Sequence, residues 1–275
     1  MAHGQRQELV LLNDNTIISD GLLGSTSSFL SVVSHTQGTS PAWLINSLLE
    51  NALEGTATLI NKDVTKKQEN RSEVLLVSFL HLRDFFVRGC KRQGLDLDGT
   101  KSFNFVDCFT DLFSEQVPDV TKAKDLVLEV VHRILKLLAG CSNDKKVVFI
   151  EGIEILLSST NLATDNLLSH LLEINKNCNQ LFVICSQDAP QFIDMNSTNA
   201  DSPIFKITDF LTKLYYRSNM NLQLNPLATG RAKDITGCLT VSRGCLPYDP
   251  VAVSVVDRNY IYCVTKESNV VLYYR

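Results

Sequence analysis

The chain has 275 residues, of which 44% are hydrophobic and 20% are charged, so it is long enough to bury a sizeable core. Its 26 basic residues are nearly balanced by 30 acidic ones, and the formal net charge is -4. This balance argues against a protein coated for nucleic acid, although a local basic patch remains compatible with it. The length fits one doubly wound α/β domain better than two domains.

The eight cysteines favour a reducing compartment over a disulfide framework. No pair has the CxxC spacing typical of a zinc site, so we expect no structural metal. The opening MAHGQRQELVLL has only a short apolar run, and no stretch approaches about 20 apolar residues. We therefore expect neither a signal peptide nor a membrane span, and a location in the cytoplasm or also in the nucleus.

Short apolar runs alternate with helical patterns along most of the chain, which predicts parallel βαβ units. Each run has the length and the β-branched character of a buried strand. The expected strands are 29–33, 74–80, 103–107, 145–151 and 181–185. The expected helices begin near Pro41 and at His81, and two more cover 122–138 and 162–172.

Two polar stretches, 61–71 and 186–204, interrupt this pattern, and we expect both to be exposed loops. Beyond them the pattern changes to short β-like segments separated by Gly, Pro and polar turns. These segments are 213–224, 238–241, 251–256, 260–264 and 269–274. The predicted fold is therefore α/β: a largely parallel sheet flanked by helices, followed by antiparallel C-terminal strands.

In an open α/β sheet, a nucleotide phosphate would bind at the first strand–loop–helix, which here contains Gly38. A phosphate loop reads GxxxxGK[ST], in which amides and a lysine bind the phosphates and a hydroxyl binds magnesium. Aligned on this glycine, the chain has Val33 at the first glycine, Thr39 at the lysine and Ser40 at the hydroxyl. Because losing one charge-assisted bond costs about 1.5–3 kcal/mol, we expect this degenerate loop not to support ATP hydrolysis by the chain alone.

Glu151 ends the run VVFIE, where a phosphate-loop enzyme usually has the Walker B aspartate that helps to hold magnesium. It is either a surviving metal-side carboxylate or a solvated strand end. We favour the solvated strand end, because the lysine that would act with the metal is absent. His81 and Asp84 share a helical turn without a serine or cysteine motif, so we expect no hydrolase triad.

The most distinctive stretch is NPLATGRAKDITGCLTV, residues 225–241, in which Gly230 and Gly237 bracket Arg231 and Lys233. Strand-like residues on both sides predict a β-hairpin whose tip presents two cations. Taken alone, the pattern fits a solvated turn equally well.

Together with RQELVLL, PAWLINSLLE and the closing VVLYYR, this stretch resembles the sixth-subunit family of the Elongator complex, in particular its fungal members. The resemblance extends from residue 7 to residue 275. It implies one RecA-like domain without working ATPase motifs, in a heterohexameric ring with the fourth and fifth Elongator subunits. It further implies that this ring binds tRNA and supports the carbon-5 modification of wobble uridine U34 by the remaining Elongator subunits. The iron–sulfur cluster and S-adenosylmethionine belong to another subunit, so the resemblance implies no cofactor and no enzymatic activity here.

Cations are the expected tRNA contacts, because each phosphate that they neutralise releases counterions. The candidates are Lys206, Lys213, Arg217, Arg231 and Lys233. Three alternatives stay open. Arg217 or Arg231 acts in trans on a neighbour's nucleotide, the chain is a stand-alone ATPase with a divergent phosphate loop, or it is a scaffold without RNA contact.

Overall fold

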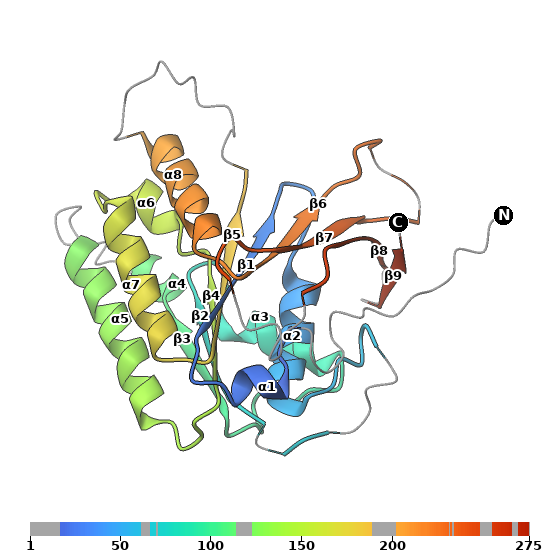
Figure 1. Cartoon of the computed structure of the whole chain (residues 1–275), viewed down its shortest axis with the longest axis horizontal. Helices are drawn as coiled ribbons and strands as arrows, with labels where there is room; N and C mark the ends of the chain where they lie inside the picture. The colour runs from blue at the N-terminus through green and yellow to red at the C-terminus, as the bar shows by residue number, and fades with distance from the viewer. Residues whose placement is uncertain are drawn as a thin grey trace.

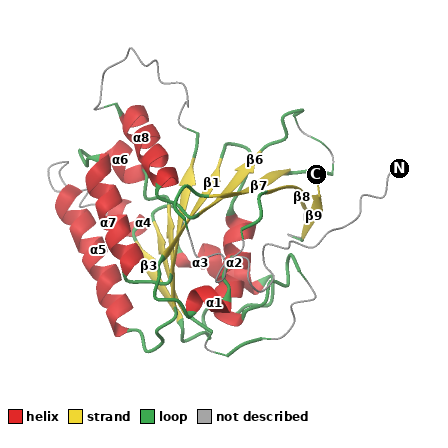
Figure 2. Cartoon of the chain, viewed as in Figure 1, coloured by secondary structure: helices red, strands yellow, loops and turns green. Residues whose placement is uncertain are grey.

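The computed structural model describes residues 17–61, 67–69, 71–113, 123–188, 202–230, 232, 234–247, 255–265 and 269–274. Within these residues, one nine-stranded sheet has the strand order β3-β2-β4-β5-β1-β6-β7-β8-β9. Helices cover both faces of its parallel part, as Figure 1 and Figure 2 show. The α/β architecture predicted from the alternating pattern is confirmed.

The strands β1 to β6 pair with one another in parallel. They are β1 (Phe29–His35), β2 (Glu73–Ser78), β3 (Phe103–Asp107), β4 (Lys146–Glu151), β5 (Gln180–Ser186) and β6 (Met220–Asn225). The central strands are buried nearly throughout because helices lie on both sides, which explains their continuous apolar runs.

The C-terminal strands continue the sheet in antiparallel pairs, as predicted for 238–241, 260–264 and 269–274. Of the expected strand 251–256, residues 255 and 256 belong to no strand, and 251–254 lie outside the described residues. They are β7 (Gly237–Arg243), β8 (Arg258–Val264) and β9 (Val270–Tyr274). Along β7, buried and half-buried residues alternate, which is typical of a strand with one face on the core. β6 joins the two parts, since it pairs in parallel with β1 and antiparallel with β7.

Two hydrophobic clusters, one on each face of the sheet, hold the helices in place. The first face carries α1 (Asp20–Leu23), α2 (Ala42–Glu54) and α3 (Arg83–Lys91). The second carries α5 (Ala123–Gly140), α7 (Thr164–Lys176) and α8 (Pro203–Tyr216). The short helices α4 (Phe109–Phe113) and α6 (Ile155–Ser159) follow β3 and β4.

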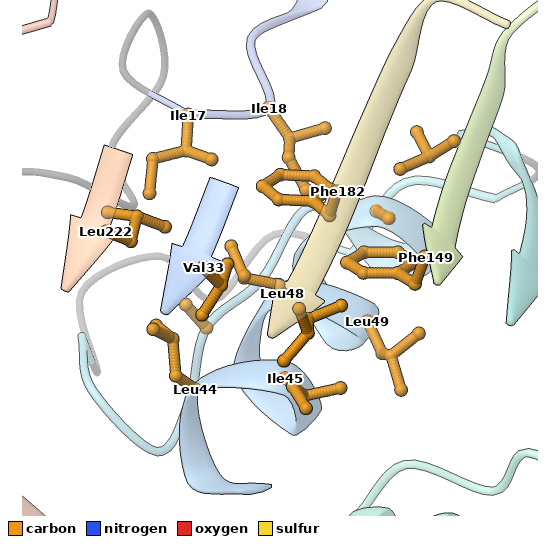
Figure 3. Packing of buried hydrophobic residues seen from close by; sticks show 14 of the residues in the cluster. Ile17, Ile18, Val33, Leu44, Ile45, Leu48, Leu49, Phe149, Phe182 and Leu222 are labelled. Atoms are coloured by element: carbon orange, nitrogen blue, oxygen red, sulfur yellow. The ribbon is translucent and has the colours of Figure 1, made fainter. Parts of the chain in front are cut away.

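The core of the first face forms where α2 packs on the middle of the sheet. Figure 3 shows Leu44, Leu48 and other side chains of α2 pointing toward the strands. Phe149 of β4 and Phe182 of β5 stack with ring centroids 4.8 Å apart and planes within 5°. Such a pair contributes about 0.5–1.5 kcal/mol beyond the area that it buries.

One predicted strand is wrong over most of its length. Segment 213–224 contains the end of α8, a short connection and then β6, so only 220–224 is a strand. Helix α8 has Pro203 in its first turn and buries Phe210, Leu211 and Leu214, which is one helical face. The run KLYY at its end is rich in residues that also favour strands, and this obscured the helical period.

The stretch 61–71 is not exposed at its ends, contrary to expectation. Asn61 is 1% exposed and Arg71 is 3% exposed. The Arg71 guanidinium donates to the carbonyls of Ile18 and Asn51 and pairs with Asp20 at 3.3 Å. Residues 62–66 and 70 lie outside the described residues, as do 189–201 of the second expected loop.

None of the helices in the described part of the chain is long and apolar enough to span a bilayer. All eight cysteines are free thiols. Burial raises the pKa of the Cys108 thiol to about 12, so this residue packs as a small neutral hydrophobe.

Candidate functional site

The carboxyl ends of β1, β2, β4 and β5 meet at one edge of the sheet, where open α/β sheets bind their ligands. The turn from β1 to α2 lies there, together with the residues that follow the other three strands. This carboxyl edge is the candidate site.

The β1–α2 turn does not present a set of open amides to a phosphate. The amide of Thr36 donates to the carbonyl of Leu224 at 3.2 Å, and that of Thr39 donates to the carbonyl of Thr36 at 3.0 Å. The Thr39 hydroxyl also donates to the Thr36 carbonyl, at 2.7 Å. The amide of Gln37 donates to the carboxylate of Asp188. A carboxylate of the chain itself therefore binds an amide of this turn.

Val33 does not belong to the turn, contrary to the alignment expected from the sequence. It is fully buried inside β1, which runs on to His35. The turn is therefore shorter than a phosphate loop placed on Gly38 would be. Gly38 has a φ of +89°, a conformation that glycine adopts without strain. The Ser40 hydroxyl accepts the amide of Ala42 at 3.4 Å, at the start of α2.

Glu151 is not a solvated strand end, because it is only 2% exposed. One carboxylate oxygen accepts the Ser78 hydroxyl at 2.6 Å, and both oxygens lie 3.1 Å from Nδ1 of His81. The Ser78 oxygen in turn accepts the amides of Leu80 and His81, at 3.2 and 2.9 Å. Ser78 and His81 therefore share one carboxylate, which differs from the serine–histidine–acid relay of a hydrolase. The network fixes the connection from β2 to α3.

A second buried carboxyl group, Glu154, was not expected from the sequence. It is 6% exposed, and one of its oxygens accepts the amide of Ser186 at 2.7 Å. Burial raises the pKa of Glu154 to about 7. Burial also shifts the pKa of His35, here downward, because it disfavours the charged form of the imidazole; the Asp188 and Glu151 carboxylates act in the opposite direction. Within the described ranges, no cluster of three His, Cys, Asp or Glu residues has the geometry to hold a metal ion.

Lys213, a predicted tRNA contact, lies on α8 and already has two acidic partners. Its Nζ atom is 2.8 Å from a carboxylate oxygen of Asp165 and 2.8 Å from one of Asp209. Hydrogen bonds to these two carboxylates raise the pKa of Lys213. Its positive charge is compensated locally, so it attracts a phosphate less than a lone lysine would.

Two other predicted tRNA contacts share α8 with Lys213, seven residues before it and four residues after it, a spacing that places the three cations on one face of the helix. Lys206 is half-buried in the first turns of α8, and the exposed Arg217 caps its C-terminus. Arg231 and Lys233 lie outside the described residues. The hairpin that carries them is confirmed as far as its strands, since β6 and β7 pair antiparallel from Met220–Arg243 to Asn225–Cys238.

Comparisons with known proteins identify a relative that aligns with 99% of this chain and solved structures that share its fold. No protein-family model matches the chain. Elongator complex protein 6 of Saccharomyces cerevisiae is 28% identical over 282 residues, which cover 99% of this chain and 100% of that protein.

Two archaeal crystal structures share the fold. The flagellar accessory protein FlaH of Methanocaldococcus jannaschii superposes with a TM-score of 0.53 at 12% identity, over 95% of this chain and 99% of FlaH. A KaiC-like protein of Pyrococcus horikoshii OT3 gives 0.54 at 13% identity, over 95% and 98% of the two chains. At such identities the likeness shows the fold alone, which is RecA-like.

Proposed function

We propose, from the premise that the chain is a distant homologue of Elongator complex protein 6, that it is a non-catalytic subunit of an Elongator complex. In this proposal it forms a heterohexameric ring with the fourth and fifth Elongator subunits, in the cytoplasm or nucleus. The ring binds tRNA and supports the carbon-5 modification of wobble uridine U34 by the remaining subunits. The observation that carries the proposal is the end-to-end similarity, together with a RecA-like fold of the same extent.

The carboxyl edge supports the non-catalytic part of the proposal. A nucleotide phosphate at the β1–α2 turn would meet the Asp188 carboxylate, which already accepts the Gln37 amide. The negative charges of the phosphate and the carboxylate would repel each other, and no lysine follows Gly38 to neutralise them. The Glu151 carboxylate is bound to Ser78 and His81, so it is not free to hold a metal.

Reconstitution with the fourth and fifth Elongator subunits tests the assembly. Light scattering on the mixture should give the mass of a ring with two copies of each subunit, and the ring should bind tRNA with an affinity that falls steeply with salt. A mixture that stays as separate chains would refute the proposal.

Thermal unfolding of the isolated chain tests nucleotide binding. A ligand present at 100 times its Kd stabilises the native state by about 2.7 kcal/mol, so a binder would show a clear rise in melting temperature. We expect none when Mg·ATP is added to the chain alone. A rise that disappears in Glu151→Gln would instead support the stand-alone ATPase.

The proposed tRNA contacts remain Lys206, Arg217, Arg231 and Lys233. Lys213 should contribute less to the tRNA affinity, because Asp165 and Asp209 compensate its charge. Replacing Arg231 and Lys233 together by alanine should weaken tRNA binding by the ring and reduce its salt slope by about 0.9 per lost duplex phosphate contact. An unchanged slope would remove the hairpin from the interface.

A further inference from the structure

Two exposed aromatic side chains lie on the outer side of α8, which packs beside α6 and α7 on the second face of the sheet (Figure 1). Phe205 is 36% exposed and Tyr216 is 66% exposed. The two lie on one line along the helix, because the step between them is about three full turns. That line is opposite to the buried stripe of Phe210 and Leu214. Exposed aromatic residues on the side away from the core are typical of a surface that binds a partner.

A cation directly follows each of these aromatic residues. Lys206 follows Phe205, and Arg217 follows Tyr216 at the end of the helix. In the part of the chain that the structure describes, neither cation has an acidic side chain within salt-bridge distance, in contrast to Lys213. The helix therefore presents two aromatic–cation pairs, 205–206 and 216–217, separated by about 16 Å along its axis.

An aromatic ring beside a cation is suited to an unpaired nucleotide. The base stacks on the ring, and the cation attracts the phosphate. Because every base has a π face, such stacking requires no particular sequence. Each pair on α8 supplies both contacts from neighbouring residues.

The middle of α8, between the two pairs, does not suit a phosphate. Lys213 is shared there by the carboxylates of Asp165 and Asp209, each 2.8 Å from its Nζ atom, so this cluster carries a net negative charge. A duplex laid along the helix would bring its regularly spaced phosphates close to these carboxylates. A flexible single strand can turn its phosphates away at this point and still place a base on each ring. The charge pattern of α8 therefore favours unpaired nucleotides over a duplex.

We propose that the outer side of α8 binds a single-stranded stretch of RNA, with one base stacked on Phe205 and another on Tyr216. Lys206 and Arg217 contact the phosphates of these nucleotides. The inference rests on the proposed function, because the tRNA of that complex supplies the RNA. It adds two stacking side chains to the proposed contacts and assigns an unpaired part of the tRNA to this helix.

Binding of tRNA and of a short oligouridylate by the assembled ring, made with the full-length chain, tests the inference. Tyr216→Ala should weaken both affinities about 5- to 150-fold, as expected for one lost base stack, without changing the salt slope. Tyr216→Phe keeps the ring and should bind like the wild type. Arg217→Ala should reduce the salt slope for the oligouridylate by about 0.7, the value for one phosphate of a single strand.

Two variants of α5 are matched controls, because this helix lies on the same face of the sheet. Leu128→Ala removes an apolar side chain that is 47% exposed, and Lys136→Ala removes an exposed cation. Both should bind RNA like the wild type. A blunt RNA duplex is the control ligand, and Tyr216→Ala should leave its affinity unchanged.

Light scattering on each variant ring separates a lost RNA contact from a lost assembly. If the wild-type ring binds tRNA and both Tyr216→Ala and Phe205→Ala bind it like Leu128→Ala, the inference is wrong while the proposed function stands. If Tyr216→Ala instead prevents assembly, this side of α8 binds a protein subunit and the inference is also wrong. An equal loss of affinity for the duplex and the oligouridylate would contradict stacking of unpaired bases. If the wild-type chain forms no ring that binds tRNA, both the proposed function and this inference fail.

Discussion

Replacing Glu151 by alanine tests whether its carboxylate is a buried part of the structure or a solvated strand end. The substitution removes the acceptor of the Ser78 hydroxyl and the partner of His81. It also leaves a space in a region where the carboxylate was 2% exposed. A solvated strand end would lose neither a buried bond nor a packed volume.

The expected cost follows from those contacts. The His81 side chain is 39% exposed, so water can replace the partner that it loses. Ser78 is fully buried, so its hydroxyl keeps a penalty of about 1–3 kcal/mol without an acceptor. We expect a loss of about 3 kcal/mol, which lowers the melting temperature by about 6–12 °C for a chain of this size.

Urea unfolding monitored by circular dichroism measures this loss. Glu173→Ala is the control, because that carboxylate is 54% exposed and lies 3.8 Å from His170, so its removal should change stability by less than about 0.5 kcal/mol. Glu151→Gln, which keeps the volume and one acceptor oxygen, should fall between the two. Equal unfolding midpoints for Glu151→Ala and Glu173→Ala would refute the buried network.

Three further predictions concern the same edge. Burial raises the pKa of Glu154 from 4.5 to about 7, so between these pH values the native state holds a proton that the unfolded chain has released, and the wild type loses stability as the pH rises. Glu154→Gln cannot ionise and lacks this dependence. Its stability relative to wild type should therefore rise by about 3 kcal/mol from pH 4 to pH 8 in urea titrations. Asp188→Ala should speed hydrogen exchange of the Gln37 amide about tenfold or more, because the acceptor is lost; equal protection by NMR would contradict the contact. Gly152→Ala should cost about 2–4 kcal/mol in the same unfolding assay, since φ is +75° and a Cβ would lie 2.4 Å from Cγ of Leu80.

The parallel strands were predictable because burial on both faces requires continuous apolar runs such as VVFIE in β4. The C-terminal strands were predictable from their alternation and their turn residues. Helix α8 was missed, because Tyr215 and Tyr216 at its end favour strands as much as helices, and the segment merges into β6 through a short connection. Only packing against α6 and α7 decides between the two states.

The network at the carboxyl edge could not be predicted, since its bonds join residues that no local pattern connects. Ser78 and Glu151 are 73 residues apart in sequence but are register partners on neighbouring strands. Gln37 and Asp188 are 151 residues apart. The strand assignments already brought their segments to one edge, but the adjacency of β2 and β4 depends on the strand order of the finished sheet.

This network changes what the missing lysine means. From the sequence, the defect is one side chain at Thr39, and restoring a lysine there would be the obvious repair. In the folded chain the amide of Gln37 is bound to Asp188, β1 runs past Val33, and Glu151 is committed to Ser78. A lysine at position 39 would restore one side chain but would correct none of these three differences. The polar groups that an ATPase directs at its nucleotide are here directed at one another, so the edge is complete without a ligand.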